Sequence, residues 1–287
     1  MMPGAAELFA LQPLTGVRFR GLHNMDGGAG AIFGGQPLLQ GLEAARRTVA
    51  DWPAHSLSAN FLRAGPVDQP VEYTVDKVRD GRRFAARRVL ATQGTKPIVD
   101  MLCSFHDPEQ GPAHQHHNRT AGAPPAESNS LQLFAQANAH RLRPERLHIY
   151  RRPFPVELRL IDPEAALFGQ AACPERTYWL RMESAAAIES GLQHQCLVAL
   201  MSDYWLASTP FATHAKAGNS GRGSAVTLNH SLWFHAPVRA DSWLLYQTAS
   251  PWAGEGRGLV RGLIHDESGQ LVASAVQEIS MRGFGDA

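Results

Sequence analysis

The sequence carries one pattern twice, at a constant spacing of 175 positions. The tripeptide HSL at 55–57 recurs at 230–232 (230 − 55 = 175), the dipeptide GR at 81–82 recurs at 256–257, and Gly94 recurs as Gly269. Alternating basic and apolar runs follow both GR pairs, and residues typical of a final strand follow both glycines. A register shared by three strands and their turns indicates an internal duplication.

Each copy predicts one helix and a set of antiparallel strands. In the first copy Leu38, Leu42 and Ala45 recur at spacings of four and three, which predicts an amphipathic helix over 36–49 with Gln40 and Glu43 facing outward. Strands are expected after it at 55–63, 72–79, 82–93 and 97–106, separated by turns that contain glycine. A helix followed by such a run favours a curved sheet wrapped around the helix, and the class is α+β.

The composition changes between the two copies. Residues from about 107 to 138 are rich in proline, glycine and polar side chains, as linkers are. We therefore predict an N-terminal unit at 1–108, a linker at 109–138 and a C-terminal unit at 139–287 that carries the catalytic residues. The linker contains His114, His116 and His117, but no further ligands at metal-binding spacing are evident nearby. We expect a solvated loop there and no metal.

The second copy places a carboxylate on the inward side of its helix. Leu192, Cys196 and Ala199 form an apolar stripe in the helix predicted at 192–206, and Asp203 is the next position on it. A carboxylate that is at least partly buried must be paired, hydrogen-bonded or functional. Asp203 is therefore a candidate for a catalytic role or for a bond to backbone groups at the end of the helix.

Polar side chains also occupy the strand at 223–235. Strict alternation places Thr227, Asn229 and Ser231 on one face and His230 on the other. Because an unpartnered buried polar group costs about 1–3 kcal/mol, such a row indicates either a solvent-exposed face or a working pocket.

The last predicted strand, 271–282, contains one amide in an otherwise apolar row. At the spacing of 175, Gln277 corresponds to Leu102 in the first copy (277 − 175 = 102), where an apolar residue serves the fold. We expect both side chains to face the interior, unless a slipped register turns Gln277 outward beside Glu278. On this basis Leu102→Gln would bury an amide without partners, at about 1–3 kcal/mol.

Charge and hydropathy limit the partners of the chain. The formal net charge of +1 gives no argument for nucleic acid or for an anionic membrane. Nowhere do about 18 apolar residues run together, so no membrane span is expected. The three cysteines are widely spaced and form no CxxC pair, which favours free thiols in a reducing compartment. We expect a cytoplasmic protein.

An ordered set of motifs resembles the type II acyl-CoA thioesterases. The matching segments are FGGQ at 33–36, HS at 55–56, FLR at 61–63, DG at 80–81, RRV at 87–89, DPE at 107–109, MSDY at 201–204, HSLWFH at 230–235, 258–261, VQE at 276–278 and MR at 281–282. The resemblance implies a double-hotdog fold, in which two helix-in-curved-sheet units form one monomer. It also implies hydrolysis of fatty acyl-CoA to free fatty acid and coenzyme A, without a cofactor, in a homo-oligomer.

The same resemblance assigns roles to three side chains. In that family an Asp, a Thr and a Gln hold the attacking water, and the matching positions here are Asp203, Thr227 and Gln277. A carboxylate can take a proton from water, while a hydroxyl and an amide fix its orientation for attack on the thioester carbonyl. A purely structural, apolar core would not require polar side chains at these three positions.

Three positions depart from the family pattern, and two other functions remain open. Ser58 stands where a second His is common, Asn229 where an Asp is common, and Ala236 where an Arg is common; Asn229 is expected to adjoin the site. A hotdog-fold enoyl-CoA hydratase would need an Asp and a His in one pocket, but His230 is expected on the face opposite Thr227. A noncatalytic acyl-CoA-binding module would release no thiol from acyl-CoA.

Overall fold

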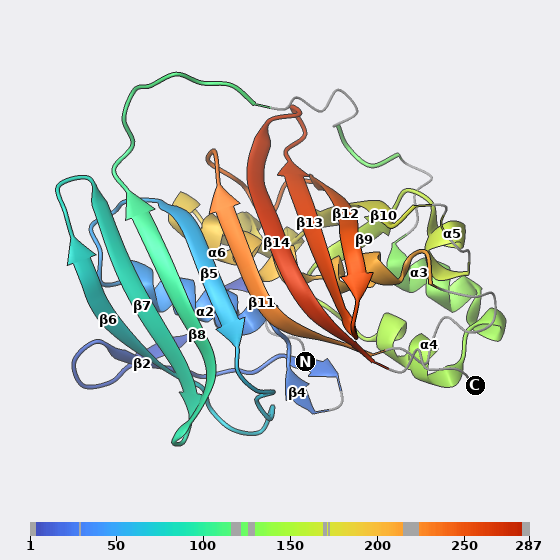
Figure 1. Cartoon of the computed structure of the whole chain (residues 1–287), viewed down its shortest axis with the longest axis horizontal. Helices are drawn as coiled ribbons and strands as arrows, with labels where there is room; N and C mark the ends of the chain where they lie inside the picture. Colours follow the sequence, from blue (N-terminus) through green and yellow to red (C-terminus); the bar gives the residue numbers. More distant parts are fainter. Residues whose placement is uncertain are drawn as a thin grey trace.

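One antiparallel sheet spans both halves of the chain. The computed structural model describes residues 4–28, 30–115, 122–125, 130–168, 171, 173–214 and 224–282. Within these residues twelve strands follow the order β1-β2-β6-β7-β8-β5-β11-β14-β13-β12-β10-β9 (Figure 1), and β3 and β4 form a separate pair. The strands are β1 (Leu11–Pro13), β2 (Arg18–Gly21), β3 (Asp26–Gly28), β4 (Ala31–Ile32), β5 (Ala54–Phe61), β6 (Glu72–Asp80), β7 (Phe84–Gln93), β8 (Lys96–His106), β9 (Glu157–Leu160), β10 (Glu175–Arg181), β11 (Ser224–Phe234), β12 (Leu244–Gly254), β13 (Arg257–His265) and β14 (Leu271–Arg282).

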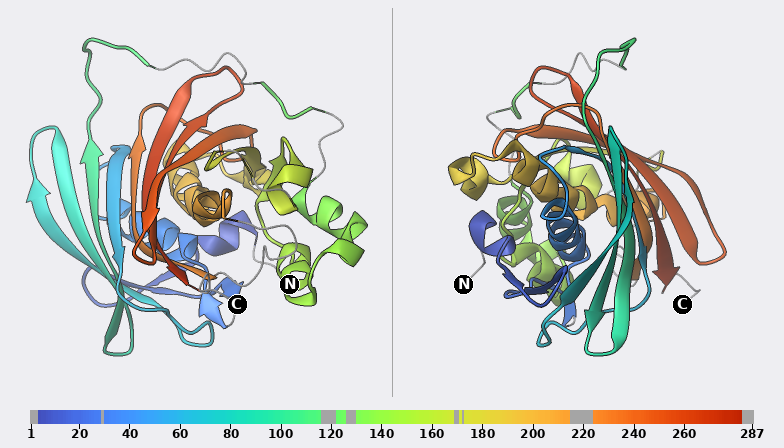
Figure 2. Two further views of the ribbon diagram at one scale, coloured as in Figure 1. Left: turned by 45° about the vertical axis from the view of Figure 1, so that its right-hand side comes forward. Right: turned by 90° about the vertical axis from the view of Figure 1, so that its left-hand side faces the viewer.

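Two longer helices, α2 and α6, lie inside the curve of the sheet and pack against each other (Figure 2). The helices are α1 (Ala5–Leu8), α2 (Gly35–Arg46), α3 (Leu131–Ala137), α4 (Pro144–Arg151), α5 (Pro163–Leu167) and α6 (Gly191–Asp203), with short 3-10 segments η1 (Ala139–Arg141), η2 (Glu183–Ala187) and η3 (Leu206–Phe211). Each half therefore places one helix on the concave face of its strands, as the sequence predicts.

The prediction that Gln40 and Glu43 of α2 face outward is wrong. Gln40 and Glu43 are 0% and 1% exposed, because the sheet covers one side of α2 and α6 covers another. The Glu43 carboxylate accepts hydrogen bonds from Arg46 and Arg47 at 2.7–2.9 Å, and the Gln40 amide oxygen accepts one from the Tyr73 hydroxyl at 2.8 Å. These partners satisfy polar groups that a half-exposed helix would leave to water.

The two halves meet at β5 and β11, close to an approximate twofold axis. Leu57 of β5 lies opposite Leu232 of β11, and these residues are 175 positions apart (232 − 57 = 175). Because each is the other's counterpart in the duplication, their pairing marks the centre of the pseudo-symmetric sheet. The join makes one continuous core from the two copies.

The spacing of 175 does not hold at the last strand. Leu57 pairs with Cys103, whereas Leu232 pairs with Ala275, so β8 and β14 correspond at 275 − 103 = 172. The counterpart of Gln277 is therefore Phe105, which is 1% exposed, and not Leu102, which is 50% exposed on the outer face. The β7–β8 and β13–β14 hairpins differ by three residues. Because side chains alternate between the two faces of a sheet, this odd difference moves the residue at a spacing of 175 to the opposite face.

The expected division into 1–108, 109–138 and 139–287 stays a prediction. The last seven residues before Asn138 form α3, so part of the expected linker is helical. His116 and His117 lie outside the described residues. Within the described part of the chain, no helix is long and apolar enough to cross a membrane, and no cluster of three His, Cys, Asp or Glu could hold a metal ion.

Candidate active site

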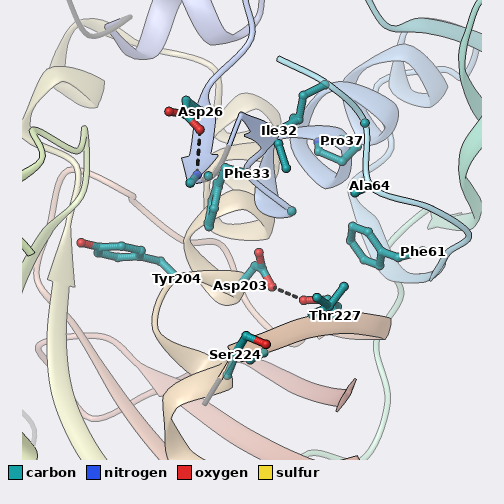
Figure 3. Close-up of a pocket in the computed structure, with 18 of the residues that line it drawn as sticks. Asp26, Ile32, Phe33, Pro37, Phe61, Ala64, Asp203, Tyr204, Ser224 and Thr227 are labelled. Carbon is teal, nitrogen blue, oxygen red and sulfur yellow. Dashed lines mark hydrogen bonds between the residues drawn. The ribbon is translucent and has the colours of Figure 1, made fainter. Parts of the chain in front are cut away.

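A cavity of about 680 Å³ lies between the two halves, where the start of α2 faces the end of α6. Figure 3 shows Phe33 just before α2, Pro37 in its first turn, Phe61 from β5, Asp203 at the end of α6 and Thr227 from β11 around this space. Most of its remaining wall is apolar. Residues 131–154, which carry α3 and α4, contribute Leu131, Ile149 and Phe154, and other parts of the chain contribute Ile32, Ile98, Val99, Tyr204, Trp205 and Val226.

Asp203 is the buried carboxylate of this cavity. It is 7% exposed, and its burial raises its pKa from 3.8 to about 6. Hydrogen bonds from the side chains of Gln277 and Thr227 and from the backbone N–H of Gly35 oppose this shift. The group is therefore ionised above about pH 6 and can accept a proton near neutral pH, as a general base requires.

Two glycines allow the first turn of α2 to approach this carboxylate. A Cβ atom on Gly34 would lie 2.7 Å from Asp203 Oδ2, and one on Gly35 would lie 2.4 Å from the carbonyl oxygen of Leu200. Both distances are too short for a side chain at either position. The glycine pair thus lets the positive end of a helix dipole and the N–H of Gly35 face the carboxylate.

Helix α6 ends directly after Asp203 in a strained turn. Trp205 adopts φ +68° and ψ −7°, in the left-handed region that bulky residues rarely occupy. The turn directs the chain into η3 and leaves Tyr204 and Trp205 in the cavity wall, where Tyr204 stacks on Phe154 with ring centroids 4.0 Å apart. Such backbone strain is found mostly where a site needs a defined geometry.

Thr227 reaches Asp203 from the neighbouring strand. Its hydroxyl Oγ1 donates to Asp203 Oδ1 at 3.4 Å (Figure 3). The expected strict alternation of β11 is wrong here, because Thr227 lies opposite Ile279 and Asn229 lies opposite Glu278, which leaves Leu228 as an extra residue in a β-bulge. The bulge reverses the alternation, so Thr227 and His230 face the same interior.

Gln277 completes the group from β14. It is fully buried, its amide Nε2 donates to Thr227 Oγ1 at 3.1 Å, and its Oε1 lies 2.7 Å from His230 Nδ1. The expected inward register of Gln277 is therefore observed. The structure brings Asp203, Thr227 and Gln277 together from one helix and two strands.

Sequence reasoning missed three contributors to this arrangement. His230 was expected on the opposite face, the Gly35 N–H could not be identified as a donor, and Ser202 attracted no notice. Ser202 Oγ lies 2.9 Å from His230 Nε2. The sequence signal for Ser202 was its place beside Asp203, directly after the apolar run 196–201, but a helical serine usually bonds to the backbone of its own helix.

Comparison with known proteins places the chain in a family. Residues 23–106 match the model of the acyl-CoA thioesterase N-terminal domain, and residues 108–281 match that of the acyl-CoA thioesterase C-terminal domain. The chain belongs to the type II acyl-CoA thioesterase family. The family predicted from the sequence motifs is thereby confirmed.

Individual relatives match nearly the whole of this chain. The chain is 34% identical to acyl-coenzyme A thioesterase 8 of Homo sapiens, over 93% of its own length and 85% of the relative. It is 33% identical to acyl-CoA thioesterase 2 of Haemophilus influenzae over 95% and 94%. The crystal structure of an acyl-CoA thioesterase II from Mycobacterium marinum superimposes with a TM-score of 0.76 at 30% identity, covering 97% of both chains.

A more distant structure supports the fold alone. A protein with a hotdog fold from Alicyclobacillus acidocaldarius is 17% identical and superimposes with a TM-score of 0.76, over 98% of this chain and 99% of its own. Together with the closer relatives, it confirms the predicted α+β double-hotdog class.

The three departures from the family pattern lie away from the carboxylate. Ser58 and Asn229 are on the outer face of the sheet, where Ser58 Oγ lies 2.8 Å from Ser231 Oγ and Asn229 Nδ2 donates to Glu278 at 3.1 Å. The expectation that Asn229 adjoins the site is wrong, because the bulge turns it outward. Ala236 is partly buried against the core.

Proposed function

We propose that this thioester hydrolase acts on fatty acyl-CoA and that Asp203, Thr227 and Gln277 hold the attacking water. The observation that carries the proposal is a buried carboxylate with a raised pKa, bonded to a hydroxyl and an amide, in the wall of a largely apolar cavity. Apolar walls with few convergent polar groups are typical of a site that binds an acyl chain and orients its reactive end. The names of the relatives support acyl-CoA as the substrate.

The proposed reaction uses water directly and forms no covalent enzyme intermediate. Asp203 takes a proton from water as the water oxygen bonds to the thioester carbonyl carbon. Thr227, which lines the cavity, orients the water, while Gln277 holds Thr227 and the carboxylate in place from behind. The resulting oxyanion collapses, the carbon–sulfur bond breaks, and the proton on Asp203 passes to the sulfur. The products are a fatty acid and coenzyme A.

The start of α2 supplies a favourable field for this chemistry. The N–H of Gly35 donates to the Asp203 carboxylate, and the positive end of the helix dipole faces the cavity. This positive end stabilises negative charge as it develops on the carbonyl oxygen, because it is already oriented before the reaction.

Geometry disfavours the hydratase alternative, for a reason that differs from the sequence-based one. His230 does face the same interior as Asp203, so the expected separation of the two residues does not hold. However, both ring nitrogens of His230 are already occupied, Nδ1 by Gln277 at 2.7 Å and Nε2 by Ser202 at 2.9 Å. An imidazole in this position cannot exchange a proton with a bound substrate.

A thiol-release assay across short, medium and long acyl-CoAs tests activity and chain-length range together. We expect release from a fatty acyl-CoA that persists in the presence of a metal chelator. Absence of release from every chain length would favour a noncatalytic acyl-CoA-binding module, and loss of activity on chelation would contradict the proposed mechanism.

Asp203→Asn tests the base itself. We expect a folded protein whose turnover is lower by about a hundredfold or more, because the amide cannot accept the proton from water. Thermal unfolding of the variant and the wild type separates this effect from a loss of folded protein. Full turnover in a well-folded Asp203→Asn protein would rule out the role.

A further inference from the structure

A chain of four hydrogen bonds leads away from Asp203 into the core. Thr227 contacts Asp203, Gln277 contacts Thr227, His230 contacts Gln277 at 2.7 Å, and Ser202 contacts His230 at 2.9 Å. Because Ser202 precedes Asp203 in α6, the chain returns to the helix where it began. His230, Gln277 and Ser202 are all fully buried, so their polar groups must satisfy one another.

The charge on Asp203 fixes the direction of every bond in this chain. An ionised carboxylate only accepts, so the single hydroxyl proton of Thr227 points to Asp203. Thr227 Oγ1 then accepts, which requires the NH₂ of Gln277 to face it and the Gln277 oxygen to face His230. The Gln277 oxygen also only accepts, so His230 must carry its proton on Nδ1.

The last bond follows from the tautomer of His230. With the proton on Nδ1, Nε2 of the neutral ring is an acceptor, and the Ser202 hydroxyl must donate to it. Ser202 Oγ also lies 2.9 Å from the carbonyl oxygen of Ala199, but its one proton cannot serve both acceptors. Burial lowers the pKa of His230 to about 4, which keeps the ring neutral at the pH where Asp203 is ionised.

We propose that His230 and Ser202 are positioning residues for the hydrolysis, which act by holding the Gln277 amide with its NH₂ group toward Thr227 and Asp203. Without a donor at His230 Nδ1, the Gln277 oxygen loses its partner in the core. The amide can then turn over, which gives up its bonds to Thr227 and Asp203 and presents its oxygen to Thr227. Thr227 would then give its proton to Gln277, and Asp203 would lose that hydrogen bond. The inference rests on the proposed function, because it assigns a role within that reaction.

Other titratable groups near Asp203 do not compete with this chain. The phenols of Tyr178 and Tyr246 lie close enough to interact electrostatically with Asp203, and burial raises the pKa of both well above the usual value. Tyr246 donates to the Ser202 carbonyl oxygen at 3.0 Å, and Tyr178 donates to the Tyr204 carbonyl oxygen at 3.4 Å. Both remain neutral donors to the backbone at any pH at which the protein is assayed.

Two amide substitutions at His230 separate positioning from packing. In His230→Asn the amide nitrogen can occupy the place of Nδ1 and donate to Gln277, whereas in His230→Gln the amide extends toward the place of Nε2 and Ser202. We expect kcat of His230→Asn to stay close to the wild-type value and kcat of His230→Gln to fall by about tenfold or more, since misplaced catalytic groups cost this much or more. KM should change little in either variant, because His230 does not line the cavity.

The pH dependence of kcat gives a readout that packing alone would not move. The hydrogen bonds of Gln277 and Thr227 lower the pKa of Asp203. Their loss in His230→Gln should therefore shift the acid limb of the kcat profile to higher pH, while His230→Asn keeps the wild-type limb. Equal kcat values and equal acid limbs in the two variants would overturn the proposal.

A measurement on the wild-type protein needs neither variant to fold. Nitrogen-15 NMR of the wild-type histidine rings reports which nitrogen of His230 is protonated. Spectra of variants that each lack one of the other histidines identify the signals that do not belong to His230. We expect the proton on Nδ1 at neutral pH, and a proton on Nε2 would overturn the proposal. If the wild type hydrolyses no acyl-CoA, the proposed function fails, but the tautomer still tests the direction of the chain.

Discussion

Asp203, the proposed general base, has a buried carboxylate whose raised pKa suits that role but lowers the stability of the folded protein. In the folded state its pKa is about 6, above the usual 3.8, because burial disfavours the ionised form. Between these two pH values the folded state binds more protons than the unfolded state, so the free energy of unfolding falls as pH rises. This pKa shift lowers the free energy of unfolding by about 3 kcal/mol well above pH 6 and has no effect on it well below pH 4.

We therefore expect Asp203→Asn to gain stability relative to the wild type as pH rises. The difference in unfolding free energy between variant and wild type should favour the variant more at pH 8 than at pH 4.5, by about 2 kcal/mol. Urea unfolding of both proteins at the two pH values measures it. A difference that does not change with pH would mean that the pKa of Asp203 is not raised.

At the scale of elements, the site depends on how closely the start of α2 approaches the end of α6. Gly34 has φ −60° and ψ −32°, which alanine adopts freely, so only its contacts exclude a side chain. Gly191, the first residue of α6, is also a glycine at a helix start, but a Cβ atom there would meet nothing within 4 Å.

This pair of glycines gives a controlled test. We expect Gly34→Ala to lower kcat by about a hundredfold, because the new methyl group lies 2.7 Å from Asp203 Oδ2 and must displace the carboxylate. Gly191→Ala should leave kcat unchanged and change stability by less than about 1 kcal/mol. Thiol release and thermal unfolding of the two variants measure both effects, and equal kcat values would show that the approach of α2 does not control the site.

Across the whole molecule, the two halves differ at the place that corresponds to the proposed site. Phe105 stands where Gln277 stands in the other half, and Trp52 packs beside it. The amide of Gln195 is bonded to both backbone groups of Ala54 at 3.1 Å. The packing at this place leaves no room for a water molecule, so we expect one active site per chain, in the cavity of Asp203.

Three substitutions test this asymmetry. Gln277→Leu should lower turnover by about a hundredfold, the scale for losing one positioned polar contact. Phe105→Gln should leave the turnover of folded molecules unchanged but cost at least about 3 kcal/mol of stability, because it removes a buried ring and buries an amide. Leu102→Gln, on the exposed face, should change neither by much. Thioester assays measure turnover and thermal melts measure stability. A loss of turnover in a fully stable Phe105→Gln protein would contradict the expectation of one active site per chain.

Local patterns in the sequence were enough to predict the duplication, the α+β class, the helix and strands of each copy, and the three polar residues that a plain core does not need. These features depend on local periodicity and on residue type, which short stretches of sequence carry. For example, the apolar helical stripe that ends in Asp203 and the single amide, Gln277, in an apolar strand row are both visible within one segment.

Only the tertiary structure decided which face each residue takes and which groups meet. The bulge at Leu228 and the three-residue difference between the hairpins each reverse an alternation of period two, and this reversal moved His230 inward and Leu102 outward. The burial of Gln40 and Glu43 depends on α6, which is distant in sequence. Register and long-range packing are set by contacts between separate segments, so periodicity within one segment cannot contain them.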